Sequence, residues 1–158
     1  MAASLSRTLV FEHPDDTARF AADLGQRLGP GDVLLLEGDV GAGKTHFARA
    51  LIRALQEHPE DVPSPTFTLV QTYDTRRGEV WHADLYRLSG AQEIEELGLA
   101  EAFTTAICLV EWPDRLGPLT PAAALMLQFR QGSAEDARIV TATWDDSRWT
   151  ALLEAVPA

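Results

Sequence analysis

The chain has 158 residues, 46% hydrophobic and 23% charged, which is enough for one globular domain with a single core. Its 24 acidic and 13 basic residues give a formal net charge of −11, which argues against independent binding to nucleic acid, because phosphate contacts need clustered Lys and Arg. The single cysteine, Cys108, excludes an internal disulfide and makes the cytoplasm the expected compartment, and no segment resembles a signal peptide or a membrane span.

The first third of the chain is expected to alternate strands and helices. Residues 6–13 predict a short strand, and residues 15–29 predict a helix with acids at its start and glycine at its end. Residues 33–37, VLLLE, form a continuous apolar run, which is typical of a strand covered on both faces. After a glycine-rich loop, residues 44–58 have the apolar periodicity of a second helix.

Residues 64–88 predict two strands around a turn at 74–78. Residues 89–103 predict one helix that starts with a capping-box spacing from Ser89 to Gln92. The apolar run AICLVE, residues 106–111, predicts another buried strand, with Cys108 in the core.

Residues 124–131 and 137–144 predict an antiparallel strand pair, and residues 147–156 predict a closing helix. No repeat or linker divides residues 1–158, so we expect a single domain. The predicted fold class is α/β, with a mixed, mostly parallel central sheet, antiparallel hairpins, and helices on both faces.

The segment GDVGAGKT matches the phosphate-loop pattern G-x-x-x-x-G-K-[ST] in full, between a predicted strand and a predicted helix. Glycines let successive backbone N–H groups point at an anion, and the helix N-terminus adds partial positive charge. We expect Lys44 to reach the β- and γ-phosphates of a nucleotide, and the Thr45 hydroxyl to bind Mg²⁺. The predicted cradle consists of Gly38, Asp39, Val40, Gly41, Ala42, Gly43, Lys44 and Thr45, with His46 next to it.

Lys44 is the only lysine in the chain, since the other twelve basic residues are arginines. The planar guanidinium of arginine cannot replace a compact ammonium between phosphates, so phosphate chemistry explains why lysine is kept here. Guanine-specific GTPases recognise the base with an N/T-K-x-D element that needs a further lysine. This chain has none to spare, which favours ATP over GTP.

A phosphate-loop magnesium site also needs a carboxylate, usually at the end of a neighbouring strand. Glu111 follows five residues, 106–110, that are all apolar, and Asp84 ends a more alternating strand. We expect one of the two to hold the metal while the other positions water or takes its proton. The sequence leaves this division open, and either acid alone could be a solvated strand-end residue.

Several neighbouring residues have two interpretations. Trp112 follows Glu111 directly, and it either packs over the nucleotide or the loop or fills the core. Thr66, in the segment SPTF, is either a switch-like sensor of the γ-phosphate or an ordinary strand entry. We expect His46 on the helix surface or in packing, and His82 as a strand residue. The acids in QEIEEL form either a solvated helix face or a partner-docking patch.

The segments GDVGAGKTHF, SPTFTLV, HADLYRL and ICLVEWP occur in the order and spacing of the bacterial TsaE (YjeE) family. The chain resembles this family over residues 34–113, about half of its length. Members of the family are P-loop ATPases required for making threonylcarbamoyladenosine in transfer RNA. The four motifs together are far more specific than the phosphate loop alone.

The resemblance implies a role for each of these segments. ATP phosphates would bind to Gly38 to Thr45, and Mg²⁺ would bind to Thr45 and Glu111. Asp84 would act in hydrolysis and Thr66 as a switch. Trp112 would lie in the active site. His46 departs from the family, where a second threonine is common, which predicts a modest change in nucleotide affinity. The terminal segments match more loosely, so Thr17 and Arg138 are only candidates for adenine contacts.

The resemblance also implies a protein partner, the TsaB–TsaD pair, which transfers the threonylcarbamoyl group to adenosine 37 of transfer RNA. ATP hydrolysis would reset this pair between cycles. We expect hydrolysis to be slow in the isolated chain and faster when the chain is bound to the pair. Transfer RNA would be reached only through the pair. Two alternatives stay open. One is a small-molecule P-loop kinase, in which Arg76 and Arg77 could imitate a lid, and the other is a non-hydrolysing nucleotide-dependent binding module.

Overall fold

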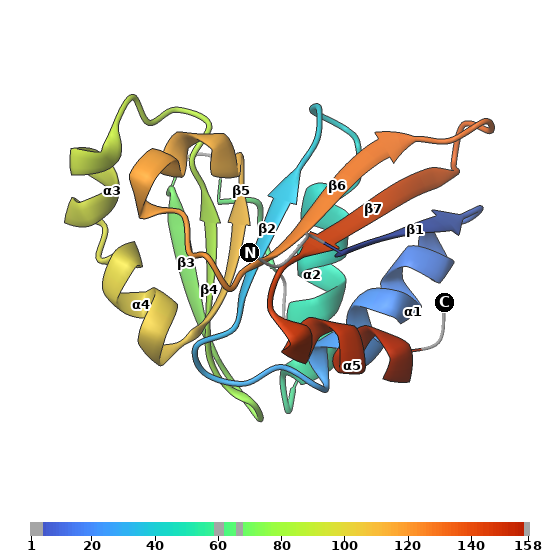
Figure 1. Cartoon of the computed structure of the whole chain (residues 1–158), viewed down its shortest axis with the longest axis horizontal. Helices are drawn as coiled ribbons and strands as arrows, with labels where there is room; N and C mark the ends of the chain where they lie inside the picture. Colours follow the sequence, from blue (N-terminus) through green and yellow to red (C-terminus); the bar gives the residue numbers. More distant parts are fainter. Residues whose placement is uncertain (1–4, 59–61, 66–67, 157–158) are drawn as a thin grey trace.

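A computed structural model of the chain describes residues 5–58, 62–65 and 68–156 (Figure 1). These residues form one α/β domain around a seven-stranded sheet with the strand order β1-β7-β6-β2-β5-β4-β3. The strands are β1 (Leu5–Phe11), β2 (Val33–Glu37), β3 (Val70–Thr75), β4 (Gly78–Asp84), β5 (Ile107–Glu111), β6 (Leu125–Gln131) and β7 (Arg138–Trp144). The helices are α1 (Pro14–Gly25), α2 (Lys44–Leu55), α3 (Ala91–Glu96), α4 (Leu99–Thr105) and α5 (Ser147–Ala155), with a 3₁₀ segment, η1 (Pro113–Leu119).

The sheet is mixed. Strand β2 pairs in parallel with β5 and with β6, and β4 pairs in parallel with β5. Strand β7 is antiparallel to β6 and to β1, and β3 is antiparallel to β4. Therefore β1, β2, β4, β5 and β6 run in one direction, as predicted. The carboxyl ends of β2, β4 and β5 meet at one edge of the sheet, which is where ligands bind in open α/β sheets.

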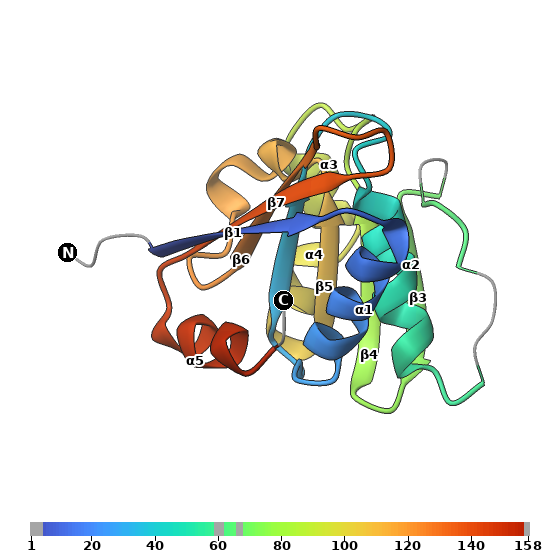
Figure 2. The same ribbon diagram turned by 90° about the vertical axis from the view of Figure 1, so that its right-hand side faces the viewer.

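Helices cover both faces of the central strands. Leu34 and Leu36 of β2 belong to one core, which contains side chains of α1, α2 and α5. Val33 and Leu35 point the other way, into a second core with side chains of α3, α4 and η1. Figures 1 and 2 show α3 and α4 on the opposite side of the sheet from α1 and α2. This arrangement confirms the prediction that the apolar run at 33–37 is covered on both faces.

The predicted helix over residues 89–103 is two helices instead, because Gly98 has φ +80° and separates α3 from α4. The predicted capping box does not form. Gly90 is the N-cap of α3, and the Ser89 hydroxyl donates a hydrogen bond to the Glu93 carboxylate at 2.6 Å. Cys108 is fully buried in β5, as predicted. In the described part of the chain, no helix combines the length and the apolarity needed to cross a membrane.

Candidate nucleotide-binding site

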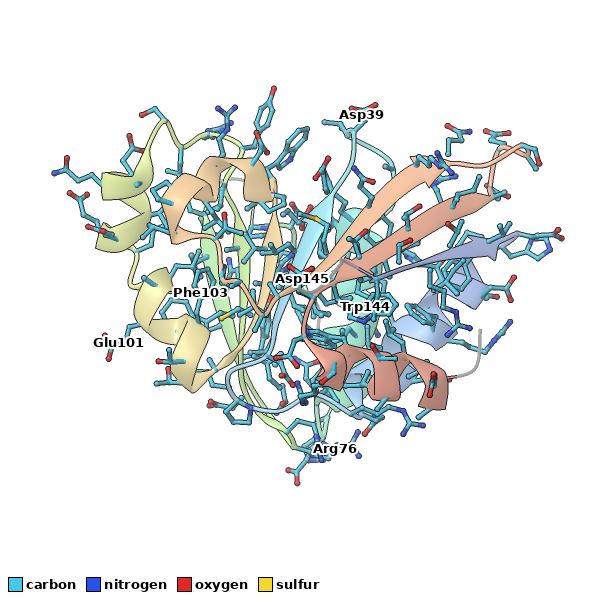
Figure 3. The ribbon with its side chains drawn as sticks, in the orientation of Figure 1. Asp39, Arg76, Glu101, Phe103, Trp144 and Asp145 are labelled. Carbon is cyan, nitrogen blue, oxygen red and sulfur yellow. The ribbon has the colours of Figure 1, made fainter. Side chains whose placement is uncertain are left out.

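The glycine-rich loop connects the carboxyl end of β2 to the start of α2, at the edge of the sheet that Asp39 marks in Figure 3. Gly38, Gly41 and Gly43 all have positive φ, at +151°, +81° and +111°. A Cβ atom on Gly38 would lie 2.5 Å from the carbonyl oxygen of Phe129, which is closer than atoms can pack. The loop therefore requires glycine for its backbone path, as a phosphate cradle does.

Lys44 begins α2 and is 5% exposed. Its ammonium donates a hydrogen bond to the Gly38 carbonyl and lies 3.7 Å from the centre of the Trp112 ring. Burial lowers the pKa of this ammonium below its ordinary value, while the negative charges of Glu111 and Asp84 act in the opposite direction. The lysine is thus held inside the site by the loop and by an aromatic face.

The two strand-end carboxylates lie side by side, because Asp84 of β4 is the register partner of Glu111 of β5. Both are buried, at 5% and 2% exposure. The Thr45 hydroxyl lies 2.9 Å and 3.1 Å from the two carboxylate oxygens of Glu111. Asp84 instead accepts a hydrogen bond from the backbone N–H of Tyr86 at 3.0 Å. The hydroxyl of the phosphate loop therefore pairs with Glu111.

His82 lies behind Glu111 on the inner part of β4. It is fully buried, and its Nε2 atom is 2.7 Å from the Glu111 Oε2 atom. The sequence analysis placed His82 in a strand but did not predict its contact with Glu111. The two residues are 29 positions apart and lie on different strands.

The cavity at this edge of the sheet has a volume of about 460 Å³. It is lined by Val40, Gly41, Gly43, Lys44, Thr45, His46, Asp84, Tyr86, Glu111, Trp112 and Arg138. Among the predicted residues, Gly38, Asp39 and Ala42 contribute to the loop but do not line the cavity. Thr66 lies outside the described residues. The remaining predicted residues are brought together.

Tyr86 is a lining residue that the sequence analysis did not single out. Its ring is half exposed and packs against Trp112 in a tilted arrangement, with the ring centres 4.8 Å apart and 51° between the ring planes. Trp112 is itself only partly buried and has a left-handed backbone, with φ +58°. The indole therefore packs against the mouth of the cavity and over Lys44. Tyr86 could have been predicted as a lining residue from its place in the segment HADLYRL, two residues after Asp84.

A smaller cavity of about 150 Å³ adjoins the first and shares Gly43, His46 and Arg138 with it. Thr17 of α1 lines this cavity, and its buried hydroxyl has no hydrogen-bond partner among the described residues. The Arg138 guanidinium donates to the Gly41 carbonyl at 3.3 Å. His46 lies 3.0 Å from the Pro14 carbonyl oxygen, so it connects α2 to the start of α1.

Arg76 and Arg77 lie at the other end of the sheet from the phosphate loop, as the labels of Arg76 and Asp39 in Figure 3 show. The Arg76 guanidinium donates to the carbonyls of Ala54 and Leu55, and Arg77 donates to the Leu28 carbonyl. These arginines connect the turn between β3 and β4 to the end of α2 and to the segment that follows α1. Arg76 and Arg77 are too far away to close on a phosphate in the cavity. They therefore do not form a kinase-like lid over it.

Two oxygen-bearing side chains in the cavity are chemically suited to Mg²⁺. In residues 5–58, 62–65 and 68–156, no group of three His, Cys, Asp or Glu side chains is arranged to hold a metal ion. A hydroxyl and a carboxylate, Thr45 and Glu111, are oxygen donors of the kind that Mg²⁺ prefers, and Mg²⁺ usually takes its other ligands from water and substrate phosphates.

Comparison with known proteins gives a consistent result. The family profile described as "Threonylcarbamoyl adenosine biosynthesis protein TsaE" matches residues 11–140. A Rickettsia felis protein named tRNA threonylcarbamoyladenosine biosynthesis protein TsaE is 42% identical over 106 residues, which cover 67% of this chain and 62% of that protein. The Bacillus subtilis protein of the same name is 36% identical over 143 residues, covering 90% of this chain and 88% of that protein.

The crystal structure of Bacillus subtilis YdiB has the same fold, with a TM-score of 0.80, 29% identity, and coverage of 99% of this chain and 97% of that one. The likeness thus extends through the flanking elements, beyond the segment at 34–113 that carries the motifs. The chain belongs to the TsaE family of threonylcarbamoyl adenosine biosynthesis proteins.

Proposed function

We propose that this chain acts in the formation of N6-threonylcarbamoyladenosine at position 37 of transfer RNA as a Mg²⁺-dependent ATPase. The observation that carries the proposal is the Thr45–Glu111 pair, with 2.9 Å between hydroxyl and carboxylate, at the edge of a glycine loop that holds Lys44. A hydroxyl, a carboxylate and a buried ammonium around one cavity are the groups that a magnesium–triphosphate complex needs.

In this proposal, backbone N–H groups of the glycine loop and the N-terminus of α2 bind the phosphates. Lys44 would leave the neutral Gly38 carbonyl and donate to anionic phosphate oxygens, which accept stronger, charge-assisted hydrogen bonds. Thr45 and Glu111 would hold Mg²⁺, which supplies charge compensation for the phosphates when bound.

Asp84 is the proposed positioner or base for the attacking water, because it lines the cavity beside Glu111. Thr66 is the proposed switch residue. Arg138 reaches the cavity, but carbonyls of Gly41, Glu135 and Ala137 engage its guanidinium. Because a positively charged group that stabilises the transition state is worth several orders of magnitude in rate, we expect slow hydrolysis by the isolated chain.

The smaller cavity is the proposed site of the adenine base. The unpartnered Thr17 hydroxyl points to a polar group that a ligand would satisfy, since buried polar groups are normally hydrogen-bonded. Arg138 lies between the two cavities and could stack on a base. His46 lines both cavities. Histidine in place of the usual threonine would therefore alter the contacts with both the phosphates and the base.

The proposed partner is the TsaB–TsaD pair. Val40 and Tyr86 are exposed apolar side chains, at 84% and 50%, and both line the mouth of the larger cavity. A protein that covers this rim could order the surrounding loops and accelerate hydrolysis, which would reset the pair between cycles. The net charge of −11 leaves transfer RNA to the partner.

The test is the release of phosphate from ATP by the chain alone, with transfer RNA, and with the purified TsaB–TsaD pair. We expect slow Mg²⁺-dependent turnover alone and stimulation by the protein pair. Stimulation by RNA with none by the proteins would refute the partner assignment. Transfer of phosphate to a small molecule would favour the kinase alternative, and tight ATP binding without any phosphate release would favour the non-hydrolysing module.

A further inference from the structure

The fully buried His82 is a polar residue that the proposed reaction does not use. It lies on the face of β4 that is turned toward α2, two residues after Val80, which is also fully buried and belongs to the apolar core on that face. Its register partner on β5 is the core residue Leu109. An apolar side chain would suit this environment, and an imidazole is costly there unless it is hydrogen-bonded.

The imidazole makes one hydrogen bond, and the geometry of that bond is specific. The Nε2 atom lies 2.7 Å from Oε2 of Glu111, and since a carboxylate oxygen accepts, Nε2 carries the proton. The Nδ1 atom has no partner among the described residues. Among the residues that the structure describes, His82 therefore bonds to Glu111 alone through Nε2, and its Nδ1 atom makes no hydrogen bond.

This bond fixes how the Glu111 carboxylate is turned. His82 contacts only Oε2, at 2.7 Å, whereas the Thr45 hydroxyl lies within hydrogen-bond distance of both oxygens, at 2.9 Å from Oε1 and 3.1 Å from Oε2. Without the imidazole, a carboxyl group at a strand end can rotate about its last torsion, which has a broad minimum. With it, Oε2 is tied to the core, and Oε1 is the oxygen that has no bond to His82 and lies beside the Thr45 hydroxyl.

We propose that His82 is a positioning residue for Mg²⁺ binding, which anchors one oxygen of Glu111 so that the other is presented together with Thr45. The inference rests on the proposed Mg²⁺-dependent binding of ATP and adds a residue to it. Outer-shell partners that orient a ligating carboxylate typically contribute 10- to 100-fold to metal affinity. His82 itself is not expected to touch the nucleotide or the metal ion.

The experiment measures the binding of Mn²⁺, a paramagnetic substitute for Mg²⁺, by electron paramagnetic resonance in the presence of the β,γ-imido analogue of ATP. His82→Leu removes the hydrogen bond and should weaken Mn²⁺ binding by about 10- to 100-fold. His82→Gln retains a side-chain N–H that can reach Oε2 and should recover most of this loss. Affinity for the nucleotide analogue in EDTA should be the same in both variants and the unaltered protein.

Val80→Ala is the matched control, since Val80 lies on the same face of β4 and is equally buried. It should lower the thermal stability and leave Mn²⁺ affinity unchanged. If His82→Leu does not fold, His82→Asn and His82→Gln form the test pair, because the shorter amide of Asn does not reach Oε2. We expect only the Asn variant to lose metal affinity.

Folded His82→Leu with unaltered Mn²⁺ affinity would overturn the inference, as would equal affinities of the Asn and Gln variants. In a Glu111→Gln background, His82→Leu should have little further effect, and a full additional loss would show that His82 acts by another route. If the unaltered protein binds Mn²⁺ with the analogue but His82 has no influence, only the positioning role fails. If the unaltered protein binds no metal with the analogue, the proposed function fails and the inference with it.

Discussion

Replacing Lys44 with alanine tests the nucleotide site most directly. In complex with ATP, the ammonium would donate at least two charge-assisted hydrogen bonds to phosphate oxygens, worth about 1.5–3 kcal/mol each. In the free protein it already bonds to the Gly38 carbonyl and lies over Trp112, and giving up these contacts costs about 2 kcal/mol together. The net loss is about 2.5 kcal/mol, so Lys44→Ala should weaken ATP binding roughly a hundredfold.

The same substitution should leave the fold intact. The lysine is at the first position of α2, where alanine is a better helix former, and burial of its charge already lowers its pKa, which indicates that the folded state gains little from the ammonium. The assay is calorimetric titration of a non-hydrolysable ATP analogue with Mg²⁺, together with thermal unfolding. Arg53→Ala, an exposed cation in the last turn of the same helix, is the control and should bind normally. Near-normal affinity of a folded Lys44→Ala would refute the assignment of the cradle.

Three further outcomes follow from the same geometry. Glu111→Gln should make ATP binding independent of Mg²⁺, whereas Asp84→Asn should bind nearly normally and hydrolyse more slowly, and calorimetry showing the reverse would exchange their roles. Gly38→Ala should lose nucleotide binding and stability, because its Cβ would meet the Phe129 carbonyl at 2.5 Å, while Gly29→Ala, whose Cβ meets nothing within 4 Å, should change neither. Burial raises the pKa of the Cys108 thiol from 9.0 to about 12. As the pH rises, this thiol therefore ionises in the unfolded chain before it ionises in the folded one. The free energy of unfolding should fall by about 1.4 kcal/mol between pH 8 and pH 10. Denaturant titrations of Cys108→Ala should lack this part of the pH slope, and an identical slope would contradict the assignment.

The outline of the domain could be predicted because its signals are local. Residues 33–36 are apolar at successive positions, so this strand needs cover on both faces, and the structure provides helices on each side. Local signals failed at the helix predicted over 89–103. There the apolar periodicity continues through Gly98, but the glycine adopts a left-handed conformation and the chain turns between α3 and α4.

The phosphate loop was also determined by the sequence itself, since its glycines, its lysine and the start of α2 are consecutive residues that act through their own backbone. The residues that the loop contacts on other strands were not determined by the sequence in this way. The order of the strands, with β5 next to β2 and β4 next to β5, decides that Asp84 and Glu111 lie side by side. No periodicity or motif specifies that order.

The same order of strands decides the finer arrangement of the site. It places His82 against Glu111, although the two are 29 positions apart, and brings Glu111 to the Thr45 hydroxyl, 66 positions away. It also carries the turn with Arg76 to the far end of the sheet, where it contacts the end of α2. The sequence by itself determined which chemical groups are available and the path of the glycine-rich loop. Only the tertiary structure decided which groups meet, because contacts between distant segments depend on how all the strands pack into one sheet.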